Sequence, residues 1–202
     1  MKELDVVLNE EKLREYNALI KIIKETVKKE DFARICLKSQ TLREKAGYEG
    51  NLSEDEINPY IKEYLDKLAY DEHNKRVEEA KANKDTKQLQ LLSNRIMDMA
   101  GYIKDGNYAK SGKINKYAKS FVDRTLIDKE LTKLYKAISN NDFDGVDAVY
   151  RRIYQMTSYS KNQPFGIVND CAQGFVDSRI DKFIEKGIHI PEQKSLEPRY
   201  EI

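Results

Sequence analysis

The chain has 202 residues, of which 40% are hydrophobic and 35% charged, and its formal net charge at pH 7 is +1. It has only nine glycines and four prolines, which argues against a disordered or loop-dominated chain, and its net charge argues against a polycation for nucleic acid. Cys36 and Cys171 give neither a disulfide framework nor a metal-ligand spacing. No apolar run approaches the roughly 18 residues of a membrane span, and the first residues are charged rather than signal-like. We therefore expect a cytoplasmic protein that has no membrane partner.

The first predicted element is a divergent helix at residues 9–29, and Asp31 then opens a shorter helix as its N-cap. A long helix is expected at residues 58–82, because its apolar residues recur at three- and four-residue steps and therefore share one face. The pair Asn58–Pro59 suits an N-cap and a first helical position. A start at Ser53, through a capping box with Glu56, is the alternative.

The same two kinds of helix follow again in the rest of the chain. A short helix is expected from Asp85 to about Ile103, after a tight turn at residues 83–84. A long helix begins near Asn115, and a further turn and a short helix at Asp142 follow it. The last long helix begins near Asn169 and ends before residue 187.

Two separate blocks of sequence show that these helices are repeats. Three ten-residue stretches, which begin at Ile57, Ile114 and Val168, share Asn at the second position, an aromatic residue at the eighth and Asp at the tenth. They lie 57 and then 54 residues apart. The short-helix openings at Asp31, Asp85 and Asp142 lie 54 and then 57 residues apart. Two blocks that agree on one period of about 55 residues predict a tandem repeat.

We therefore predict an all-α fold of about seven helices, in which antiparallel helix pairs repeat every 55 residues or so. One amphipathic pair cannot bury its apolar face alone, so the pairs are expected to stack as a short α-solenoid or a compact helical-repeat bundle. The predicted single domain covers residues 1–190, with units near 31–84, 85–141 and 142–187. Residues 191–202 are expected to form a C-terminal tail.

One recurring acid is a candidate for partner binding. The Asp that ends each ten-residue stretch falls opposite the apolar face of its own helix, at 100° per residue. One interpretation is a row of surface carboxylates that meets a basic partner. The other is a structural link to the next repeat, through Arg95, Arg152 or a helix N-terminus. The three candidates are Asp66, Asp123 and Asp177.

The middle of the chain is basic, since residues 81–140 hold thirteen Lys and Arg against six Asp and Glu. A basic segment with interleaved aromatic residues is a candidate for nucleic-acid binding. For the lysines, the alternative is a solvated helix face. For the recurring tyrosines after the short helices, Tyr48, Tyr102 and Tyr159, the alternative is a ring wedged between helices. The nucleic-acid candidates are Lys104, Lys110, Lys113, Lys116, Lys119, Tyr102 and Tyr108.

No motif for catalysis, metal binding or a cofactor is found. His73 follows two acids, but adjacent residues of a helix diverge by 100° and no second ligand stands at the helical spacing. Cys171 occupies an apolar-stripe position, which indicates a packed thiol rather than a nucleophile. Phosphate-binding loops and Ser/His/Asp constellations are absent from the sequence. We therefore expect no cofactor, no metal and no small-molecule ligand.

These observations favour a non-catalytic helical-repeat protein that binds another protein, as a scaffold, adaptor or inhibitor. The alternative is a nucleic-acid-binding accessory protein that uses the lysine-rich middle segment. A third hypothesis is an enzyme whose site is assembled from scattered residues. The Lys-, Asn- and Tyr-rich composition suggests a phage or mobile element of an AT-rich bacterium as the source.

Overall fold

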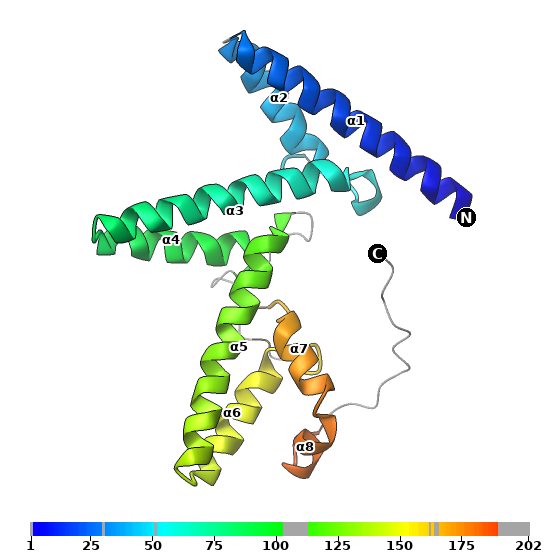
Figure 1. The fold of residues 1–202 in the computed structure, drawn as a ribbon. Helices are drawn as coiled ribbons and strands as arrows, with labels where there is room; N and C mark the ends of the chain where they lie inside the picture. Colours follow the sequence, from blue (N-terminus) through cyan, green and yellow to red (C-terminus); the bar gives the residue numbers. More distant parts are fainter. Residues whose placement is uncertain are drawn as a thin grey trace. The chain divides into compact units, whose positions relative to one another are not determined.

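The computed structural model describes residues 2–29, 31–50, 52–102, 113–161, 163 and 166–189. All regular structure in these residues is helical, which confirms the predicted all-α class (Figure 1). No helix among them is both long and apolar enough to cross a bilayer. In chain order, the elements are α1 (Lys2–Lys28), α2 (Phe32–Lys45), the 3-10 turn η1 (Glu54–Glu56), α3 (Pro59–Ala82), α4 (Thr86–Met99), α5 (Lys116–Ser139), α6 (Phe143–Gln155), α7 (Asp170–Asp177) and α8 (Ile180–Glu185).

The chain divides into two compact units. The first contains the described residues of Met1–Gly101 and Ala109–Lys119, and the second those of Tyr102–Tyr108 and Ser120–Ile202. The division falls within α5 and not at a predicted unit boundary. The prediction of a single repeat domain therefore stays a prediction.

In the first unit, α1 packs on α2 and α3, and α3 packs on α2 and α4. Figure 1 shows α1–α2 and α3–α4 as helical hairpins. A buried cluster of Leu42, Ala46 and Ile61 lies where α2 meets α3. Partly buried side chains from α1 cover this cluster, among them those of Tyr16 and Leu19. The short and long helices therefore share one apolar interior, as their amphipathic patterns indicate.

In the second unit, α5 and α6 form a hairpin whose apolar faces enclose one core with α7 and α8. Phe183 of α8 is fully buried there, and its ring meets Tyr150 edge-on at 4.8 Å between centroids. Other buried members of the core are Ile127, Leu134, Val146, Val149, Ile153 and Val176.

The predicted helix ends and turns are largely confirmed. Asp31, Asp85 and Asp142 cap α2, α4 and α6, each accepting a backbone N–H three residues on. The turns before α4 and α6 place Lys84 and Asn141 at φ of 53° and 55°. These left-handed residues close the tight connections expected at both places.

Both starts considered for the first long helix occur. Asn58 caps α3 by accepting from the N–H groups of Tyr60 and Ile61. Ser53 and Glu56 form a capping box, but it opens the separate turn η1. Extended backbone at Ile57 then divides this turn from α3.

Three predicted helix boundaries were wrong. α1 begins at Lys2 and not at residue 9, and α4 ends at Met99, where Gly101 at φ 83° terminates the helix. The last long helix breaks into α7 and α8, so the described residues hold eight α-helices rather than seven. At this break, the Ser178 hydroxyl donates to the Phe175 carbonyl, a local bond that competes with helix continuation.

Candidate functional site

The recurring Asp and Tyr residues bind one another. The hydroxyl groups of Tyr48 and Tyr102 donate to Oδ1 of Asp66 and Asp123. The Tyr159 hydroxyl donates to Oδ1 of Asp177 at 2.6 Å. Each bond joins a Tyr that follows α2, α4 or α6 to the next α-helix, α3, α5 or α7, so the same polar contact occurs at three equivalent places of the sequence.

The recurring Asn connects each of the first two Asp residues to the next long helix. The Asn115 side chain donates to the backbone carbonyl of Asp66 at 2.7 Å, and the Lys116 N–H donates to its Oδ2 at 3.1 Å. In the second unit, Asn169 donates to the Asp123 carbonyl at 3.0 Å, and the Asp170 N–H donates to Oδ2 at 2.8 Å. We call each set of Tyr, Asp and Asn with these bonds a polar joint.

A backbone bond completes the recurring arrangement. The Asn58 N–H donates to the Lys45 carbonyl at 2.9 Å, Asn115 to Met99 at 2.8 Å, and Asn169 to Met156 at 2.9 Å. Each bond ties the N-cap of a long helix to the end of the short helix before it. Each of the three Asn side chains also caps its own helix by accepting backbone N–H groups.

Burial makes these bonds costly to break. Asp66 and Asp123 each expose 1% of their surface, and Asn115 and Asn169 expose 2% and 1%. A buried carboxylate needs donors or a positive partner. The positive end of a helix N-terminus supplies both, and at Asp66 the Lys62 ammonium adds two bonds of 3.1 Å.

The surroundings of the polar joints also shift the pKa values of their tyrosines. Burial raises the pKa of the Tyr48 phenol above its usual range, and the bond to Asp66 raises it further. Burial and the bond to Asp123 raise the pKa of Tyr102 in the same way. Both phenols are therefore neutral donors at physiological pH, a structural role rather than that of a general acid or base.

The expected surface row of carboxylates does not occur, and this corrects the first interpretation of the recurring Asp. Asp66 and Asp123 lie opposite the apolar stripe of their own helix, but the N-terminus of the next long helix covers them. Only Asp177 is exposed, and no further helix N-terminus donates to it within the described residues. The link to a neighbouring helix N-terminus is what the bonds of Asp66 and Asp123 form.

The lysine-rich candidates are dispersed among different surroundings. Tyr102 is buried at 3% exposure, and Lys119 is half-buried. The Lys116 ammonium lies 2.9 Å from the Glu63 carboxylate, which raises the pKa of Lys116. Lys113 is exposed. Lys104, Lys110 and Tyr108 lie outside the described residues.

His73 and Glu130 occupy equivalent positions of successive long helices, 57 residues apart. Glu130 is buried and binds Arg152 at 2.8 Å and Lys133 at 2.5 Å. His73 is also buried, but its Nδ1 has no partner in the described structure. Burial lowers the pKa of His73, and the nearby Arg95, the equivalent of Arg152, lowers it further.

The described residues contain no group of three or more His, Cys, Asp or Glu side chains able to hold a metal ion. Cys171 is half-buried and packs against the core of the second unit. Among the described residues, the recurring Tyr, Asp and Asn side chains bond to neighbouring segments and so join helices.

Comparisons with protein-family models, curated proteins and solved structures give no match to this chain.

Proposed function

We propose that the chain is a non-catalytic protein-interaction module, acting as a scaffold, adaptor or inhibitor. The observation that carries the proposal is that the polar joints bond helices to one another. Of the recurring residues best suited to chemistry, Asp66 and Asp123 are buried, and both bond to Tyr and Asn side chains of neighbouring segments. What the fold presents outward is helix surface, which suits recognition of another macromolecule.

The module is proposed to be a tandem repeat of helix pairs, stacked as a short solenoid or compact bundle. The equivalent Tyr–Asp bonds, the equivalent Asn caps and the equivalent backbone bonds to the preceding short helix support this organisation. Asp177 is exposed, and among the described residues no helix N-terminus donates to it as one does to Asp66 and Asp123.

Nucleic-acid binding receives less support from the described lysines. Lys116 is paired with Glu63, and the aromatic ring of Tyr102 is buried rather than available for stacking on a base. A catalytic role would need perturbed carboxylates gathered in a pocket, and Asp66 and Asp123 instead have their donors within the joints.

Capture from a lysate of the source cells, with and without nuclease, tests the proposal. We expect the tagged full-length protein to retain one protein in stoichiometric amount, and nuclease treatment should not release it. Loss of all partners on nuclease treatment would shift the function to nucleic acid. Retention of no protein would remove the interaction module itself.

A further inference from the structure

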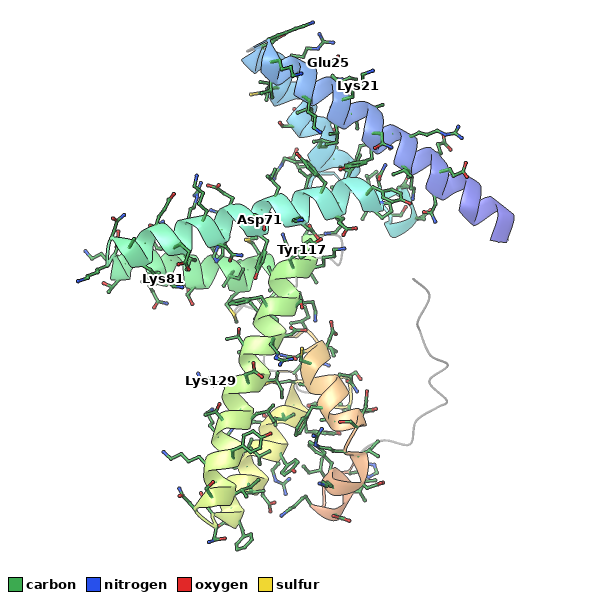
Figure 2. The ribbon with its side chains drawn as sticks, in the orientation of Figure 1. Lys21, Glu25, Asp71, Lys81, Tyr117 and Lys129 are labelled. Carbon is green, nitrogen blue, oxygen red and sulfur yellow. The ribbon has the colours of Figure 1, made fainter. Side chains whose placement is uncertain are left out.

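A hollow lined largely by tyrosines lies on the first unit, outside the polar joints. It encloses about 540 Å³ between α1, α3 and the first turn of α5. Volumes of this size accommodate ligands or anchoring side chains of a partner. Figure 2 labels Asp71 on α3 and Tyr117 at the start of α5, both of which line it. We call it the tyrosine groove; its lining residues are Tyr16, Tyr60, Glu63, Tyr64, Lys67, Leu68, Asp71 and Tyr117.

The tyrosine rings support one another. The Tyr16 ring centroid lies 6.5 Å from that of Tyr60 and 6.0 Å from that of Tyr64. Tyr117 stacks on Tyr70 at 6.2 Å and donates its hydroxyl to Glu63 at 3.1 Å. Rings held in this way form a contact surface that loses little conformational entropy on binding, which is why tyrosine is enriched at binding hot spots.

Several groups in the groove are unused by the fold. The hydroxyls of Tyr16, Tyr60 and Tyr64 have no hydrogen-bond partner in the described part of the chain. Leu68 exposes 53% of its surface at the groove edge. A tyrosine hydroxyl and an exposed leucine side by side offer both polar and apolar contacts to a partner.

The charge of the groove selects the kind of partner. Its lining has two carboxylates and one lysine, Lys67; because Glu63 already pairs with Lys116 at 2.9 Å, Asp71 is the carboxylate left for a partner. Tyrosine faces attract cations, and Asp71 can bond to one, so the groove favours a cationic group of a partner. One cation already lies over a ring at the edge, where the Lys116 ammonium stands 5.2 Å from the centroid of Tyr117.

We propose that the tyrosine groove binds an arginine-bearing segment of a protein partner. This inference rests on the proposed interaction function and names its surface. A guanidinium stacks on tyrosine faces and bonds to carboxylates, and its apolar neighbours in the segment contact Leu68. Asp71, which is exposed and has no ion-pair partner among the described residues, provides the carboxylate.

Selection of random twelve-residue peptides on the full-length protein tests this proposal without knowledge of the partner. Leu68→Lys and Asp71→Lys change the groove at exposed positions, so neither variant should disturb the core. Leu91→Lys is the matched control, because Leu91 is an exposed leucine of α4 at 63% exposure and does not line the groove. Circular dichroism melts verify that all three variants fold.

We expect the selected peptides to be enriched in arginine, and both groove variants to weaken their binding at least roughly tenfold while Leu91→Lys leaves it unchanged. Replacement of the peptide arginine by glutamine should have the same effect as Asp71→Lys. Peptides without basic residues, binding that ignores both groove variants, or selection of no peptide would each overturn the proposal. The interaction function would survive these outcomes if the lysate capture still retained a protein, so the two failures are distinguishable.

Discussion

Removal of the Asp123 carboxylate should destabilise the second unit strongly. Asp123→Ala leaves the buried Tyr102 hydroxyl and the Asp170 N–H without their acceptor. An unsatisfied buried donor costs about 1–3 kcal/mol. Asp170 is exposed, so water can replace Asp123 as the acceptor of its N–H. The total cost of the two donors therefore falls in the lower half of their combined range, at about 2–4 kcal/mol.

Urea denaturation followed by circular dichroism measures this loss, with an unchanged m-value as the sign that the denatured state is comparable. Asp128→Ala is the matched control on the same helix, since Asp128 is exposed and its carboxylate forms a surface ion pair with Arg124 at 3.2 Å. Such a surface pair contributes less than about 1 kcal/mol. A double-mutant cycle with Tyr102→Phe should show a coupling energy. If Asp123→Ala costs no more than the control, the polar joint does not stabilise the fold as argued.

Three further changes test other parts of the structure. Burial and Arg95 lower the pKa of His73 in the folded protein. The folded form therefore resists protonation, and its stability should fall as the pH drops from about 6.5 toward the lowered pKa of the folded state. His73→Gln should reduce this loss of stability, measured by thermal melts at pH 7 and pH 5. Burial alone would raise the pKa of Glu130, but its bonds to Lys133 and Arg152 outweigh burial and lower the pKa. Glu130→Gln should therefore reduce the free energy of unfolding by about 1–3 kcal/mol in urea titrations at pH 7. The reduction should become progressively smaller as the pH falls below about 4.5. Lys84→Gly should increase the free energy of unfolding by up to about 1 kcal/mol, and so raise the melting temperature slightly, because Lys84 has a left-handed backbone.

The ends of the helices could be predicted because their signals are local. An Asp or Asn cap bonds to an N–H only two or three residues on, so the sequence nearby contains the whole interaction. The same holds for the turns at Lys84 and Asn141. The break after α7 was missed, because Ser178 and Arg179 continue a helical pattern and carry only a weak signal against it.

The burial of the recurring Asp could not be derived from its own helix. Helical periodicity places Asp66 opposite the apolar stripe, which normally means solvent. Its cover comes instead from Asn115 and Lys116, about fifty residues later. The shared pattern of Asn and Asp did contain this pairing, since both recur in every ten-residue stretch.

The tyrosine groove was missed for a related reason. Tyr60 and Tyr64 fit the apolar stripe of α3, and Tyr117 fits that of α5, so each is expected in the core of its helix. Tyr16 comes from α1, which the sequence marks as a helix divergent from the later long ones. Only the packing of α1 against α3 brings these rings together.

The central claim is that the chain binds a protein, and the salt dependence of that binding tests it most directly. The affinity of the purified full-length protein for its captured partner, after nuclease treatment, is measured by calorimetry at 50 and 200 mM salt. We predict a defined stoichiometry and an affinity that changes by less than about tenfold, because few ion pairs would be screened. A loss of about a thousandfold or more would indicate displacement of counterions from phosphates and would contradict the account.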